Sequence, residues 1–93
     1  MNMETVSEKL IEFFQNNILY GESFDDIDRD ESLIDKGYID SIGIISLVAY
    51  IENTIGIKVY DNEIIPENFD SINSIYGYLN RKLGAQEKTV QVV

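Results

Sequence analysis

The chain has 93 residues, of which 44% are hydrophobic, and a formal net charge of −10 at pH 7. This length supports one small core, and the absence of cysteine excludes a disulfide-stapled fold. The negative charge disfavours nucleic acid and anionic membranes as partners, although it can equally serve solubility alone. With no signal-peptide pattern and no apolar stretch of bilayer length, we expect a soluble, cytoplasmic and monomeric protein.

The first expected helix begins near Val6 and carries an amphipathic stripe. The apolar residues of that stripe are Val6, Leu10, Phe13, Phe14 and Ile18. Residues 5–8 fit a capping box, in which Thr5 and Glu8 each satisfy a backbone N–H at the helix start. Tyr20 and Gly21 are expected to mark the exit from the helix.

Residues 21–40 lack helical periodicity and are strongly acidic. Between Glu22 and Asp35 lie seven acidic residues against Arg29 alone. Scattered apolar residues could pin the segment to a core: Phe24, Ile27, Leu33, Ile34, Tyr38 and Ile39. We expect an ordered long loop, which is uncommon in so small a domain unless the loop is functional.

Three further helices are expected after this loop. The second begins at Ser41, with apolar residues at Ile44, Leu47, Val48, Ile51 and Ile55 and with Gly56 as its C-cap. Residues 61–65, before Pro66, predict a minor helical turn. The fourth has the stripe Ile72, Ile75, Tyr76, Leu79 and Leu83, capped by Asp70 or Ser71 and ending at Gly84. We expect one domain at residues 1–84 and a disordered tail at 85–93.

The residue types limit the chemistry that this chain can perform. Without histidine or cysteine there is no imidazole base, no thiolate nucleophile and no ordinary zinc site. Asp26, Asp28 and Asp30 match the first positions of a calcium-binding EF-hand loop. Glu31 and Gly37 then stand where glycine and glutamate are required, which argues against a dedicated calcium site. We expect neither an enzyme nor a metal centre.

The remaining candidate site is the Asp40-Ser41 pair at the expected start of the second helix. Such a pair is a good N-cap in any protein. A serine at a helix N-terminus also lies where backbone N–H groups and the helix dipole favour a phosphate on its oxygen. Regulatory phosphorylation and a phosphodiester-linked group fit this position equally well.

The wider pattern separates these possibilities. Residues 31–42, with a leucine-containing loop, Gly37, the Asp40-Ser41 pair and Ile42, resemble the acyl carrier and peptidyl carrier protein family. This resemblance covers roughly residues 4–83 and implies an all-α, four-helix bundle with three main helices, one short helix and a long first loop.

The resemblance also implies the roles of individual residues. Ser41 would carry covalent 4'-phosphopantetheine, taken from coenzyme A by a phosphopantetheinyl transferase. Asp40 and Ile42 would be recognised by that transferase and by partner enzymes. The module would carry an acyl or aminoacyl thioester from an adenylating loading enzyme to downstream transferases or synthases. It would catalyse nothing itself.

Two positions depart from members that serve fatty-acid synthesis. Those members carry acids early in the second helix, where this chain has Gly43 and Ser46. The departure favours a specialised polyketide, nonribosomal-peptide or modified fatty-acid pathway. Gly43 also suggests close approach by a partner or by the arm. The alternative function is a non-enzymatic acidic adaptor that binds a basic protein, with a calcium sensor third.

Overall fold

The computed structural model describes the backbone of residues 2–92 and the side chains of residues 2–85. All regular structure in that part is helical. The elements are α1 (Met3–Asn17), a 3-10 turn (Phe24–Asp26), α2 (Ser41–Tyr50), a π-helical segment (Ile51–Ile55), a 3-10 turn (Asp61–Glu63), α3 (Pro66–Phe69) and α4 (Ile72–Val92). The predicted all-α class, with three main helices, one short helix and a long first loop, is confirmed.

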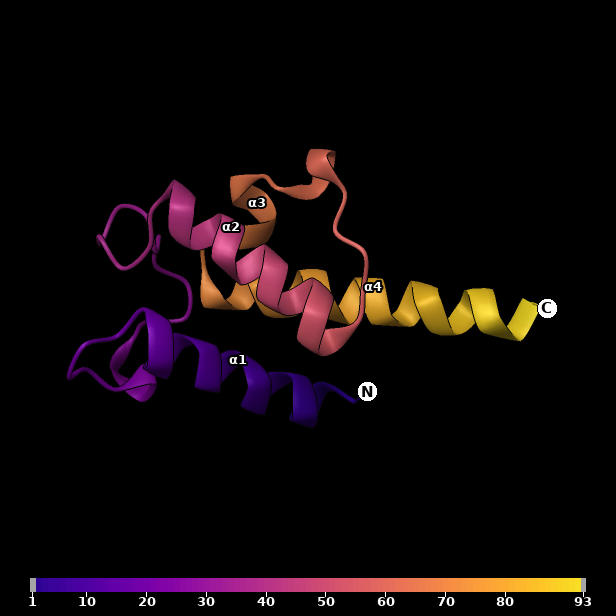
Figure 1. The fold of residues 1–93 in the computed structure, drawn as a ribbon, viewed down its shortest axis with the longest axis horizontal. Coiled ribbons are helices and arrows are strands. Elements are labelled where there is room, and N and C mark those ends of the chain that lie inside the picture. The colour runs from indigo at the N-terminus through magenta and orange to yellow at the C-terminus, as the bar shows by residue number, and fades with distance from the viewer. Residues whose placement is uncertain (1, 93) are drawn as a thin grey trace.

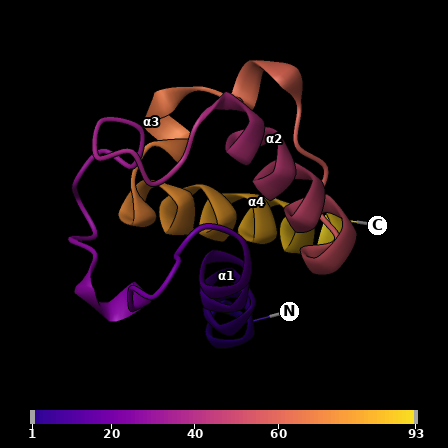
Figure 2. The ribbon, with the colours of Figure 1, turned by 60° about the vertical axis from the view of Figure 1, so that its left-hand side comes forward.

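The helices form a small bundle around α4. Figure 1 shows α1 running along one side of α4, α2 crossing on the other side, and α3 beside the start of α4. Figure 2 shows α1 nearly end-on, with α2 and α3 above it. The loop after α1 passes around one end of this bundle before α2 begins there, whereas both chain termini lie toward the other end (Figure 1).

The first helix buries the stripe that its sequence predicts. Val6, Leu10, Phe13 and Phe14 are buried, and Ile18 follows directly after the helix as its C-cap. The capping-box prediction is wrong, because the helix begins earlier than expected. Its N-cap is Asn2, whose side-chain oxygen accepts the Thr5 N–H at 2.9 Å, so residues 5–8 lie inside the helix.

The second helix runs as predicted from Ser41 to Ile55, with its last turn wound as a π-helix. Leu47, Val48, Ile51 and Ile55 are buried. Gly56 then ends the helix with a φ of 85°, a left-handed conformation that glycine adopts without strain.

The helical turn predicted before Pro66 is present, and a second short helix follows it. Residues 61–63 form a 3-10 turn within the predicted range 61–65, whereas α3 begins at Pro66, where no helix was predicted. The physical reason is that proline lacks an N–H and has a fixed φ, both of which suit the first turn of a helix.

The fourth helix has the expected cap and a different end. The Ser71 hydroxyl accepts the Ser74 N–H at 3.1 Å, and Ile72, Ile75, Leu79 and Leu83 are buried. The backbone continues as helix beyond Gly84 to Val92. The expected disorder of residues 85–93 stays a prediction, since side chains after residue 85 and all of residue 93 lie outside the described part.

The acidic loop is ordered by contacts with the region between α3 and α4. Phe24, Ile27, Leu33 and Ile39 are buried as predicted, while Ile34 is exposed. The carboxylate of Asp70 accepts the Ser32 hydroxyl at 2.7 Å and the Ile34 N–H at 3.1 Å. These bonds fix the middle of the loop, at residues 32–34, before the chain reaches α2 at Ser41.

Candidate functional site around Ser41

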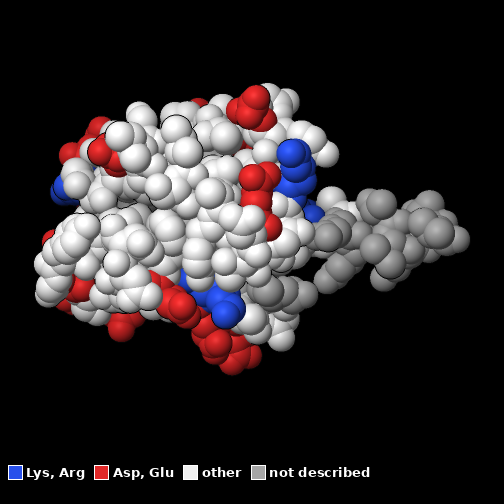
Figure 3. Space-filling view, in the orientation of Figure 1, with Lys and Arg blue, Asp and Glu red and all other residues white. Residues whose placement is uncertain are grey.

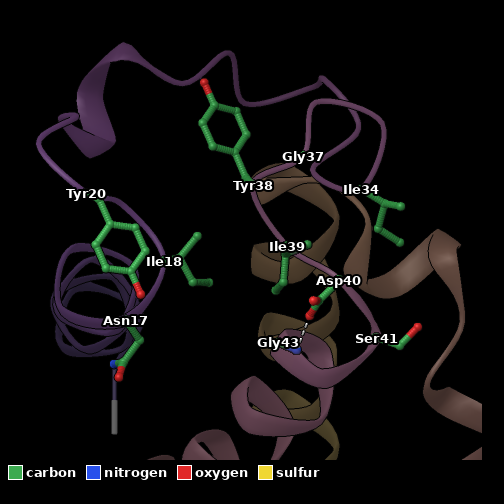
Figure 4. A pocket seen from close by; sticks show the side chains of 10 residues that line it. All are labelled: Asn17, Ile18, Tyr20, Ile34, Gly37, Tyr38, Ile39, Asp40, Ser41 and Gly43. Atoms are coloured by element: carbon green, nitrogen blue, oxygen red, sulfur yellow. Dashed lines mark hydrogen bonds between the residues drawn. The ribbon is translucent and has the colours of Figure 1, made fainter.

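Ser41 is the first residue of α2 and is exposed to solvent. Asp40 is the N-cap, and its carboxylate accepts the Gly43 N–H at 2.8 Å. Because Asp40 supplies the cap, the Ser41 hydroxyl is not needed to start the helix. In Figure 4 that hydroxyl points away from Asp40, toward solvent. An exposed hydroxyl with no capping duty is suited to covalent modification by another enzyme.

The electrostatics at this helix start favour an anionic substituent. The first turn of α2 contains no acidic side chain, so only Asp40 offsets the positive end of the helix dipole. N–H groups of a helix's first turn have no partners within the helix and can bond phosphate oxygens. The residues at Ser41 therefore fit a phosphodiester such as that of phosphopantetheine.

A hollow of about 480 Å³ adjoins Ser41, and we call it the Ser41 hollow. Three stretches of chain form its walls: the end of α1 with the residues after it, the last residues of the acidic loop, and the start of α2. Figure 4 shows Ile18 and Tyr20 on one side and Ile39 with Asp40 on the other. Asn17, Ile18 and Tyr20 were not among the predicted site residues, since their sequence position indicated only a helix exit.

Gly43 lines the same hollow, and the structure gives a reason for a glycine there. A Cβ on Gly43 would lie 2.6 Å from Cγ1 of Ile39, which is closer than side-chain carbons approach. Ile39 is buried and cannot easily give way. The close neighbour is therefore a side chain of this same chain, whereas the sequence suggested a partner or the arm.

Ile42, the predicted partner-contact residue, is 74% exposed, and Ile45 on the same helix is 65% exposed. Figure 3 shows that charged side chains are sparse on the face over α2 and that acids gather mainly toward its edges. The exposed surface of α2 is therefore uncharged, with Ile42 and Ile45 as its large apolar side chains, in agreement with the absence of acids at positions 43 and 46.

Acidic side chains of the loop act on Tyr38, which is half-buried at the hollow. Partial burial, together with the nearby carboxylates of Glu22, Glu31 and Asp26, raises the pKa of the Tyr38 phenol above 10.0. The acids do not converge further: among the described residues no three acidic side chains form a group that could hold a metal ion. No helix in this part of the chain has the length and apolarity to cross a membrane.

Comparison with known proteins gives consistent matches. The family model described as "Phosphopantetheine attachment site" matches residues 20–79. The D-alanyl carrier protein of Streptococcus uberis is 39% identical over 71 residues, covering 76% of this chain and 86% of the relative. That of Streptococcus pyogenes serotype M5 is 31% identical with the same coverage.

A solved structure described as "Crystal structure of FAD-dependent dehydrogenase" also matches, with a TM-score of 0.64 and 32% identity. The match covers 76% of this chain and 99% of the solved chain. The solved chain is therefore shorter than this one and is close in size to the helical domain described above.

Proposed function

Because the chain belongs to the phosphopantetheine-binding carrier protein family and tethers an acyl or aminoacyl group on that covalent arm, we propose that Ser41 is the attachment residue. The observation that carries this proposal is the exposed Ser41 hydroxyl at the start of α2, free of the capping role that Asp40 fills. Within the arm, the thiol supplies the thioester chemistry that a chain without cysteine lacks.

Carriers of this family work with a phosphopantetheinyl transferase and with loading enzymes. For this chain, we propose that Asp40 and Ile42 contact the transferase, and that Ile42 and Ile45 form an apolar contact with the loading enzyme. The exposure of both isoleucines supports this proposal. We further propose that the chain catalyses no step itself, since it has no histidine or cysteine to activate Ser41.

The cargo that fits best is an amino acid activated by an adenylating enzyme. The D-alanyl carrier proteins of the two streptococci support this choice, as does the lack of acids in the first turn of α2. A cytoplasmic location belongs to the same proposal, because ATP for adenylation and coenzyme A for the arm are both available there.

Attachment is tested by incubating the protein with coenzyme A and a broad-specificity phosphopantetheinyl transferase. We expect the intact mass to rise by one phosphopantetheine group, and Ser41→Ala to abolish the rise while leaving the circular dichroism spectrum unchanged. Ser46→Ala, on the exposed surface of the same helix, is the matched control and should be modified normally. A mass gain that survives in Ser41→Ala would refute the assignment.

Asp40 has two proposed roles, to cap α2 and to present a negative charge to the transferase, and two variants separate them. Asp40→Asn can still accept the Gly43 N–H, so stability should change little while the rate of arm attachment falls. Asp40→Ala should lower both the stability and the rate of arm attachment. If Asp40→Asn is modified at the wild-type rate, the carboxylate serves only as a cap.

A second candidate is that the tethered cargo is oxidised while on the carrier. The matched solved structure is described as a FAD-dependent dehydrogenase, although the chain of it that matches is shorter than this small protein. A carrier-sized chain under that description supports a carrier that works with such an enzyme. Oxidation would transfer two hydrogens from the cargo to the flavin. Intact mass spectrometry of the protein isolated from its native host distinguishes an aminoacyl group from one lighter by two hydrogens.

A further inference from the structure

The Ser41 hollow has an apolar floor and an aromatic rim. Ile39 is buried and Ile18 is half-buried, and both pack on the core while lining the hollow. Tyr20 is 86% exposed, so nearly all of its ring faces solvent at the rim. Tyr38 stands above the hollow in Figure 4. Small-ligand sites are lined mainly by apolar and aromatic side chains with a few polar groups, and the lining of this hollow is of that kind.

Apart from the backbone N–H groups at the start of α2, which favour the phosphodiester, the charged side chains at the hollow are all acidic. No lysine or arginine is among the residues that line the hollow, and the Asp40 side chain lies on the same side as Ile39 (Figure 4). The carboxylates of Glu22, Glu31 and Asp26 act on Tyr38 at the rim. Next to these carboxylates a cation is therefore favoured, and the faces of Tyr20 and Tyr38 also attract cations.

We propose that the Ser41 hollow receives the thiol end of the arm when it carries an amino acid. The proposal rests on attachment at Ser41 and deepens it by naming the part of the protein that senses the cargo. In it, the protonated α-amino group lies among the Asp40 carboxylate and the rings of Tyr20 and Tyr38. A small aliphatic side chain then lies over Ile18 and Ile39.

The arm is long enough for this placement. From phosphorus to sulfur it has about as many bonds as four to five residues of extended chain, so it spans on the order of 15 Å. Although the Ser41 hydroxyl points toward solvent, an arm of this length can turn back around the start of α2. Tethering then makes even a weak contact effective, because the local concentration of the cargo is on the order of millimolar.

The hollow therefore distinguishes an aminoacyl cargo from a neutral acyl cargo of the same shape. Alanyl and propionyl groups differ only by the amino group, so they form a matched pair for a test. Each is joined to the arm through a stable amide in place of the thioester, and the arm is attached to 15N-labelled protein.

In amide NMR spectra we expect the alanyl form to shift the signals of Gly37, Ile39 and Gly43 relative to the unloaded arm. The propionyl form should shift them much less. Tyr20→Ala should remove most of the difference, and its remaining spectrum shows whether the fold is kept. Tyr60→Ala, at a 55% exposed tyrosine outside the hollow, is the control and should leave the difference intact.

A second readout is the lifetime of the alanyl thioester in buffer without any enzyme. We expect hydrolysis to be about two- to fivefold faster in Tyr20→Ala than in the wild type, the factor that one exposed cation–π contact supplies. The propionyl thioester should hydrolyse at the same rate in both proteins.

Equal shifts from alanyl and propionyl forms, or no shifts at residues 37–43, would overturn this inference. Such a result leaves attachment at Ser41 standing, since the arm must be in place for the spectra to be recorded. Failure of the mass gain with coenzyme A would instead overturn the assignment of Ser41 itself.

Discussion

Replacing Gly43 by alanine sets two physical effects against each other. Alanine is the better helix former by roughly 0.5–1 kcal/mol, so local propensity predicts a more stable protein. The new Cβ, however, would lie 2.6 Å from Cγ1 of Ile39 and 3.4 Å from Oδ1 of Asp40, the cap of the same helix. Ile39 is only 5% exposed, so neighbouring side chains hold it in place.

Overpacking of this kind costs about 1–3 kcal/mol, which exceeds the propensity gain. We therefore expect Gly43→Ala to lower the free energy of unfolding by about 1 kcal/mol, equivalent to a Tm lower by about 4–8 °C for a domain of this size. Urea unfolding followed by circular dichroism at 222 nm measures the free energy, and a thermal scan measures Tm.

Gly77 provides the matched control, because it lies within α4 where a Cβ would meet only the flexible end of Arg81, at 3.5 Å. Gly77→Ala should raise the free energy of unfolding by roughly 0.5–1 kcal/mol. Ile39→Ala removes the clashing atom, so adding Gly43→Ala to that variant should be neutral or stabilising. If Gly43→Ala stabilises the wild type as much as Gly77→Ala does, the steric argument fails.

Three other predictions concern the loop, the pH dependence and the first helix. Asp70→Ala should lower the free energy of unfolding by about 1–3 kcal/mol, because it removes the acceptor for Ser32 and Ile34. It should also speed amide hydrogen exchange at Leu33 and Ile34, and unchanged exchange at these residues would contradict the prediction. Burial alone would raise the pKa of Glu63, but hydrogen bonds from Tyr60, Lys82 and Tyr78 outweigh it and hold that pKa below 4.5. The charged form of Glu63 thus stabilises the fold above pH 4.5, and this contribution is lost as pH falls through the folded pKa. Between pH 6 and pH 3, Glu63→Gln should therefore lose less stability than the wild type in urea unfolding. Parallel stability curves for the two proteins would refute this. Asn2→Ala should cost about 0.5–2 kcal/mol of stability through loss of the N-cap, whereas Thr5→Ala should leave that cap in place. Equal losses of stability in the two variants would favour the predicted capping box at residues 5–8.

The sequence alone determined the helical class and most of the core. Helical periodicity is a local property, so spacings of three and four residues correctly placed Leu10 and Phe14 in α1, Leu47 in α2, and Leu79 in α4 on buried faces. Gly56 was recognised as a C-cap for the same reason. The family could also be inferred, since its motif is a contiguous run that ends at Ile42. The roles of Asp40, Ser41 and Ile42 remain predictions for the experiments above.

Local pattern was less reliable where several short signals compete. The start of α1 moved to an asparagine cap at Asn2, and α3 began at Pro66. Tyr78 was not predicted to be buried, although its ring packs against Phe69 and its hydroxyl donates to Glu63 at 3.1 Å. That hydroxyl finds its partner fifteen residues away, beyond the range of helical spacing.

Only the tertiary structure decided the surroundings of Ser41. The hollow joins residues 17–20, residues 34–39 and the start of α2, and the loop keeps its place through Asp70, which follows α3. The spacing of these segments along the chain does not specify their contact, because a loop can close in many ways until distant hydrogen bonds and buried side chains select one. The same packing against Ile39 explains the glycine at position 43.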